Sequence, residues 1–286
     1  MTVCFVIGRR GLSPRQQADV ELETKQHDDL LLLDVRDGSA SFPAAAKMLA
    51  WWRWAASRLL PPPSASGTPR PARGFAVKTE EDVFIHLPHL HSELLRLRCH
   101  PLLFSGQLAY SGYNPVRLSG CGWSWTADDR NYRLYGCWRS GHHPPVPFVN
   151  GQLEVLSAAL AHLLATSAEA AAFVERASER ETSGAGTERG TEGEDVILGW
   201  IASRLQGNVT YVGLDTEGRA RLINLACARK YVCMPPNNCG LYQTPNRSQL
   251  AVHWVKQPEG QAYLWRVFHD GDPHEPAACQ RAAGTQ

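Results

Sequence analysis

The sequence predicts an α/β fold in which a Rossmann-like, mostly parallel central sheet is flanked by helices. In the first hundred of its 286 residues, short apolar runs alternate with stretches of helical pattern, the order that builds strand–helix–strand units. The apolar runs are continuous rather than interrupted by polar residues, which is typical of strands buried on both faces of a parallel sheet. Polar residues follow these runs, as expected where the strand ends of such a sheet meet a ligand.

The first half of the chain is expected to hold three strands and three helices. Ser13 suits the N-cap of the first helix, because Pro14 follows at the first helical position. The third helix is predicted from leucines that recur with helical spacing. In order, the expected elements are a strand at 3–7, a helix from Ser13, a strand at 30–35, a helix at 42–60, a strand from 75 into acidic residues 80–82, and a helix at 86–100.

The second half is less regular. Asn150-Gly151 is a turn signal. Residues 178–193 carry no apolar side chain larger than alanine, which predicts a mobile loop or insert. The remaining expected elements are a strand at 101–108, a helix at 153–176, a helix opening at 194–195, a strand at 250–255 and a frayed tail at 273–286.

Composition excludes several classes of protein. A formal net charge of +1 gives no support for a nucleic-acid-binding surface, so no nucleic-acid partner is expected. No window has the uninterrupted apolar length needed to span a bilayer. Eight cysteines are present without a Cys-x-x-Cys pair, which argues against a structural zinc site.

Three consecutive carboxylates at Glu80, Glu81 and Asp82 follow an apolar strand and precede another apolar run. Like charges so close together are costly unless a cation or solvent neutralises them. A hard divalent cation prefers oxygen ligands, so one interpretation is a metal site that holds a phosphate-bearing substrate. The other is a solvated acidic turn. Gly8 and the polar residues 34–37 are predicted at the same sheet edge, which favours the metal site.

The order of these segments resembles glycosyltransferase family 31, the β-1,3-galactosyl- and N-acetylglucosaminyltransferases. Residues 75–85 resemble the stretch in which that family carries three aspartates, although two of the three are glutamates here. Residues 194–199, Glu-Asp-Val-Ile-Leu-Gly, are similar to its Glu-Asp-Val-x-x-Gly element. The other similar segments are residues 3–8, 27–37, 44–54, 147–157 and 250–256. The combination of Lys-Thr-Glu-Glu-Asp-Val-Phe with Val-His-Trp-Val-Lys is most similar to the kinetoplastid phosphoglycan β-1,3-galactosyltransferases.

This resemblance implies a single glycosyltransferase-A-type catalytic domain at residues 1–272. Residues 1–100 would form its nucleotide-sugar-binding half and residues 101–272 its acceptor-binding half, with the flexible insert at 178–193 and the tail at 273–286. The implied reaction is the inverting transfer of galactose or N-acetylglucosamine from a UDP-sugar to a glycan or phosphoglycan hydroxyl, in β-1,3 linkage. The implied location is the lumenal side of the Golgi membrane, through an N-terminal anchor that this chain does not contain.

The resemblance also implies roles for individual residues. Asp195 is expected as the catalytic base, oriented by Glu194. A divalent metal, Mn²⁺ with Mg²⁺ as the alternative, is expected on Asp82, His253 and Glu80. The residues expected around the donor are Asp34, Asp37, Lys47, Glu80 and Glu81. Aromatic residues expected as an acceptor platform, or else as core, are Trp123, Trp125, Tyr132 and Tyr135.

Two other functions remain open from the residues alone. The same acidic strand end would suit a metal-dependent hydrolase acting on a phosphoester or sugar nucleotide. The two glutamates in place of aspartates would also suit a degenerate, transferase-like domain that binds glycans without catalysis.

Overall fold

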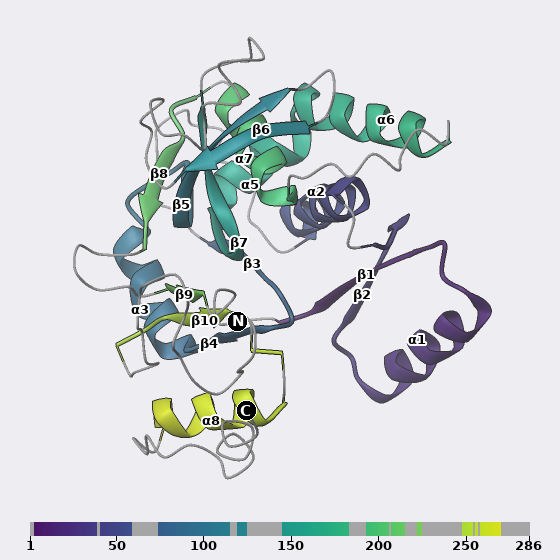
Figure 1. Cartoon of the computed structure of the whole chain (residues 1–286), viewed down its shortest axis with the longest axis horizontal. Coiled ribbons are helices and arrows are strands. Elements are labelled where there is room, and N and C mark those ends of the chain that lie inside the picture. The colour runs from purple at the N-terminus through teal and green to yellow at the C-terminus, as the bar shows by residue number, and fades with distance from the viewer. Residues whose placement is uncertain are drawn as a thin grey trace, which may run out of the picture.

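The fold combines helices and strands in a mixed α/β architecture, as the sequence predicts (Figure 1). The computed structural model describes residues 3–38, 41–58, 74–114, 119–124, 145–182, 193–205, 207–214, 222–224, 248–253, 255–256 and 258–269. Of the predicted segments, the tail at 273–286 lies outside these residues, as do Trp125, Tyr132 and Tyr135. Residues 178–182 of the predicted insert continue a helix, and 183–192 lie outside the described residues.

The N-terminal strands β1 (Phe5–Arg10) and β2 (Leu30–Arg36) pair in parallel, joined by helix α1 (Pro14–Gln26). Ser13 caps α1 as predicted, because its hydroxyl accepts a hydrogen bond from the Gln16 N–H. The prediction that these strands are buried on both faces is wrong. Gly8 and Leu33 are their only buried residues, because α2 is the only helix with substantial contact to the pair among the described residues.

The largest sheet has the strand order β3-β7-β5-β6, with β8 pairing the start of β5. The predicted mostly parallel sheet is not confirmed, because the described part of this sheet is mostly antiparallel. Strand β6 is antiparallel to β5, and β7 is antiparallel to both β3 and β5, whereas β8 runs parallel to its partner β5. Their bounds are β3 (Phe75–Thr79), β5 (Leu103–Asn114), β6 (Ser119–Ser124), β7 (Val146–Ser157) and β8 (Thr210–Gly213).

Strand β7 overturns two sequence predictions. It runs through Asn150-Gly151, where a turn was predicted, and through the predicted start of a helix at residue 153. The turn signal instead marks a bulge. Gly106 of β5 pairs with Glu154, while Leu108 pairs with Val149, so residues 150–153 form a bulge opposite the single residue between them on β5. Ser157 then caps α5 (Ala158–Thr166), and α6 (Ala168–Thr182) follows after Ser167.

Both faces of the large sheet are buried. Helices α2 (Ser41–Arg58), α5, α6 and α7 (Glu194–Arg204) pack on one face around Trp52, Phe104 and Phe173 (Figure 1). Helix α3 (Leu87–Leu97) packs with the opposite face, where Leu103, Leu153 and Val155 are buried. At the C-terminal end of β7, Leu153 and Val155 enter one core and Leu156 enters the other, which fixes the register of this part of the strand.

A smaller sheet has the order β4-β10-β9, and helix α8 (Pro258–His269) packs beside it (Figure 1). Its strands are β4 (Val83–Ile85), β9 (Leu222–Asn224) and β10 (Ala251–His253). Strand β10 is antiparallel to β4 and parallel to β9, so segments that are far apart in the sequence pair in this sheet. The predicted strand at 250–255 is therefore confirmed, with a shorter span.

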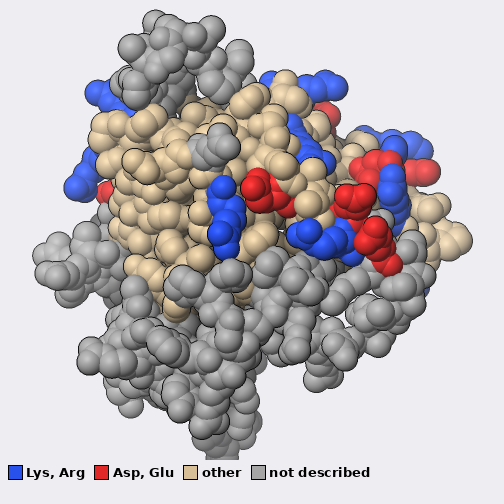
Figure 2. All heavy atoms as spheres, turned by 90° about the horizontal axis from the view of Figure 1, so that it is seen from above, with Lys and Arg blue, Asp and Glu red and all other residues tan. Residues whose placement is uncertain are grey.

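The surface seen in Figure 2 carries acidic and basic side chains side by side, without an extended patch of one sign among the residues it describes. This distribution agrees with the small net charge. Among the described residues, no helix has both the length and the apolar character needed to cross a membrane.

Candidate metal and catalytic site

The acidic residues lie in a tight turn between two sheets. Strand β3 ends at Thr79 and β4 begins at Val83, whose N–H donates to the Glu80 carbonyl at 3.2 Å. On the neighbouring strand, His253 is the register partner of Val83, and the Val255 N–H donates to the Asp82 carbonyl at 2.8 Å. The antiparallel pairing of β4 with β10 therefore carries the histidine to the acidic turn.

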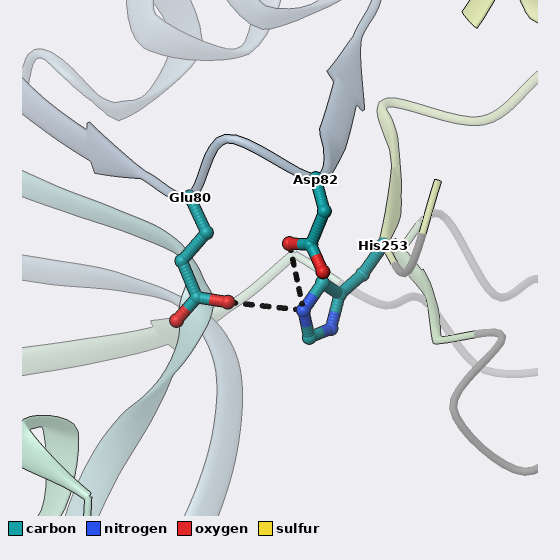
Figure 3. A group of neighbouring side chains, drawn as sticks. All are labelled: Glu80, Asp82 and His253. Atoms are coloured by element: carbon teal, nitrogen blue, oxygen red, sulfur yellow. Dashed lines mark ion pairs between the residues drawn. The ribbon is translucent and has the colours of Figure 1, made fainter. Parts of the chain in front are cut away.

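Glu80, Asp82 and His253 point toward one another (Figure 3). The His253 Nε2 atom lies 3.0 Å from Glu80 Oε2 and 3.4 Å from Asp82 Oδ1. Asp82 is 4% exposed and His253 9% exposed, whereas Glu81 faces solvent. The hydrogen bond from His253 is the main reason that the pKa of Glu80 is lowered to about 2, so Glu80 is ionised at neutral pH. Two carboxylates and one imidazole thus converge.

This donor set fits a divalent cation. One oxygen or nitrogen atom from each residue lies within 4.8 Å of the others. Ligands bound to one octahedral ion at roughly 2.1 Å lie about 3 Å apart, close to the separations seen here. Mixed carboxylate and imidazole ligation suits Mn²⁺. The ammonium group of Lys256 contacts the second oxygen of Asp82, so this carboxylate already faces a positive charge on its outer side.

Lys78 connects this cluster to a second group of carboxyls. Its Nζ atom lies 2.9 Å from Glu194 Oε1, 2.9 Å from the Gly151 carbonyl and 3.4 Å from Glu80 Oε1. Burial alone would lower the pKa of Lys78, but the carboxylates of Glu154, Glu194 and Glu80 outweigh it and raise the pKa, so the ammonium stays charged. Sequence reasoning missed Lys78. The available signal was its spacing from Glu80, since residues two apart on a strand share a face.

Glu154 was also missed. It is the cross-strand partner of Lys78 and is 0% exposed. Neither carboxyl oxygen has a hydrogen-bond partner among the described residues. Burial, with a smaller contribution from Glu194, Asp195 and Glu80, raises the pKa of Glu154 well above its ordinary value. The sequence feature that could have identified Glu154 is that it is the one charged residue in the apolar run 153–156.

Asp195 lies at the start of α7, next to the bulge in β7. Its Oδ2 atom accepts from the Gly151 N–H at 3.2 Å, and its Oδ1 atom accepts from the Val196 N–H at 2.8 Å. Burial is the main cause that raises the pKa of Asp195 to about 7, and the neighbouring charge of Glu194 adds to it. A carboxylate with that pKa is matched to accepting a proton near neutral pH.

The residues expected around the donor have partners of their own. The carboxylate of Asp37 accepts from the N–H groups of Gly8 and Gly38 and pairs with Lys47 at 2.6 Å, which joins β1, β2 and α2. Asp34 pairs with Arg9 and Arg10 at the exposed end of the strands, and the hydrogen bonds from Arg10 and Arg9 lower the pKa of Asp34 to about 2.

Of the predicted aromatic platform, the structure describes Trp123. It lies in β6 and is 37% exposed, so it is not part of the buried core. This position suits packing against a sugar ring.

Comparison with known proteins identifies the family of the chain. No match was found among curated proteins. A family model described as galactosyltransferase matches residues 1–176, which include β1 to most of α6 and the acidic turn. Asp195 and His253 lie beyond the matched part. Since the match spans more than half of the sequence, the chain belongs to the galactosyltransferase family.

Proposed function

We propose that this protein transfers galactose from UDP-galactose to a glycan hydroxyl with inversion, in β-1,3 linkage and with help from a divalent cation. One observation carries the proposal: the Glu80, Asp82 and His253 cluster is linked through Lys78 to the start of α7, where Asp195 has a pKa of about 7. Lys78 joins the two through its contacts with Glu80 and Glu194. Family membership supports glycosyl transfer in general.

The residues divide the chemistry between them. Glu80, Asp82 and His253 would hold the cation, Mn²⁺ in our proposal, which supplies Lewis-acid stabilisation of the charge that develops on the diphosphate. Asp195 would take the proton of the acceptor hydroxyl as that oxygen attacks the sugar carbon. A single displacement with one base inverts the configuration, whereas a retaining mechanism needs a second carboxylate as nucleophile.

Three features support an intact site over a degenerate one. The longer side chain of Glu80, which replaces an expected aspartate, still reaches His253 at 3.0 Å. Asp82 is buried at the centre of the cluster. Asp195 keeps two backbone hydrogen bonds that fix its orientation. Each of these would be dispensable in a domain that only bound glycans.

We further propose that the acceptor is a glycan or phosphoglycan and that the protein acts on the lumenal side of the Golgi membrane. Trp123, exposed on β6, supports a sugar-binding surface. Asp34, Asp37 and Lys47 would lie toward the nucleotide, since they gather at the end of the β1–β2 pair. Glu81 would reach the donor from the solvent side of the turn.

The test is a transfer assay with purified protein, UDP-galactose, Mn²⁺ and a panel of acceptors that includes β-galactosides and phosphoglycans, with UDP-N-acetylglucosamine as the competing donor. We expect a β-linked galactosyl product, identified by NMR of its anomeric proton. Release of galactose or phosphate without a glycan product would instead support the hydrolase. Binding of glycans without any turnover would support the degenerate domain.

A further inference from the structure

One buried ammonium group lies between the two halves of this site. The side chain of Lys78 is 16% exposed, and its three acceptors come from different segments: the acidic turn, the β7 bulge and the start of α7. These segments are far apart in the sequence: Gly151 is 73 positions and Glu194 is 116 positions after Lys78. A single side chain therefore joins three independent pieces of backbone.

We propose that Lys78 is a positioning residue for transfer: its ammonium group holds Glu80 of the metal cluster in register with the Glu194–Asp195 pair. The inference rests on the proposed function, and it adds a residue that neither the acidic turn nor the catalytic pair contains. Lys78 does not touch the reacting atoms in this account. It acts through the carboxylates that it holds.

On the metal side, Lys78 decides which oxygen of Glu80 faces the cluster. Its Nζ atom lies by Glu80 Oε1, while Glu80 Oε2 faces His253. A partner that holds the outer oxygen of a ligating carboxylate fixes the direction of the inner one. Removing the ammonium would free the Glu80 side chain to rotate, and it is 33% exposed and has room to do so.

On the catalytic side, Lys78 holds the β7 bulge against α7. The Gly151 carbonyl accepts from Lys78, and the Gly151 N–H donates to Asp195, so one residue of the bulge contacts both side chains. The space around Gly151 is tight: a Cβ atom there would lie 2.9 Å from Glu80 Oε1 and 3.0 Å from Lys78 Nζ. A shift of the ammonium group would therefore reach Asp195 through a single residue, Gly151.

The charges around Lys78 explain why the relative position of Glu80 and Glu194 depends on its ammonium group. Glu80 and Glu194 both contact the ammonium, and the buried carboxyl of Glu154 lies across the strand pair. Without the ammonium group, the side chains of Glu80 and Glu194 would face each other in a partly buried site with no donor between them. We expect them to move apart and the two halves of the site to lose their register.

The experiment compares wild type, K78M, K78R and a K25M control, in which an exposed lysine of α1 loses its charge. Three quantities are measured and referred to the concentration of folded protein: the Mn²⁺ dissociation constant, by calorimetry without substrate, and kcat and KM for UDP-galactose. We expect K78M to weaken Mn²⁺ binding and lower kcat, each by about 10- to 100-fold, as is typical when a partner of a metal ligand is removed. K78R, which keeps the charge, should lose less of both, and K25M should match wild type.

A double variant separates positioning from general stability. If Lys78 and Glu194 act through their contact, K78M/E194Q should lose little more kcat than the more impaired single variant. A K78M protein that melts at a lower temperature yet keeps wild-type Mn²⁺ affinity and kcat would overturn the inference and leave the proposed function standing. A wild-type protein that neither binds Mn²⁺ nor transfers galactose would overturn both.

Discussion

The rate of transfer should rise with pH through neutrality, because the proposed base must be ionised to accept a proton. Burial and the charge of Glu194 raise the pKa of Asp195 from 3.8 to about 7. With that pKa, Asp195 is about one tenth ionised at pH 6 and about nine tenths ionised at pH 8. The predicted increase in kcat over this interval is therefore about tenfold.

Glu194 provides the perturbation that tests the cause of the shift. Its negative charge disfavours ionisation of Asp195, so Glu194→Gln should move the midpoint of the pH profile to lower pH. The midpoint should stay above the ordinary aspartate value, since burial is the larger cause and is unchanged. Asp195→Asn should abolish the pH-dependent rate at every pH, because an amide does not accept the proton.

The assay is initial-rate galactosyl transfer between pH 5.5 and 8.5, at saturating donor and acceptor. Mn²⁺ is kept saturating at each pH, because its ligands must also be deprotonated and would otherwise add their own pH dependence. A flat profile for wild type would refute Asp195 as the base. An unchanged midpoint in Glu194→Gln would refute the electrostatic origin of the shift.

Three further predictions concern stability and are measured by urea unfolding. Gly106→Ala should cost about 1–3 kcal/mol, because a Cβ atom would lie 2.2 Å from the Leu153 carbonyl oxygen at the bulge; an unchanged midpoint would mean that the bulge is not tightly packed. Ser157→Ala should cost about 2 kcal/mol, since its buried hydroxyl accepts from two backbone N–H groups, and a silent substitution would contradict this cap. Asp37→Ala should cost about 1–2 kcal/mol and Asp34→Ala clearly less, because Asp37 accepts hydrogen bonds from two backbone N–H groups whereas Asp34 forms exposed ion pairs; a larger loss of stability for Asp34→Ala would refute the comparison.

The local elements of the first half could be predicted because their signals are local. The cap at Ser13, the helices at α1 and α2 and the pairing of β1 with β2 follow from spacing and capping residues. The direction of the large sheet could not be predicted in this way. It depends on β5 and β7 pairing with each other, and Asn150-Gly151 reads as a turn unless the bulge opposite Gly106 is known.

The metal cluster was predictable in part, since Glu80, Asp82 and His253 were expected together and the structure brings them together. The neighbouring group around Lys78 and Glu154 was not predictable from the sequence. Lys78 looks like an ordinary strand residue, and its importance appears only when the bulge and the start of α7 are placed beside it. Glu154 could not be assigned a role either, because its partner Lys78 lies on a neighbouring strand, and the local sequence does not specify which strands pair.

The most direct test of the account is metal-dependent transfer by wild type and Asp82→Ala, with Asp19→Ala on the exposed face of α1 as the control. We expect EDTA to abolish galactosyl transfer by wild type and added Mn²⁺ to restore it. Asp82→Ala should remain folded by circular dichroism yet transfer at least about 100-fold more slowly at the same Mn²⁺ concentration. Transfer that persists in EDTA, or a folded Asp82→Ala protein with wild-type activity, would contradict the claim that this cluster holds the catalytic cation.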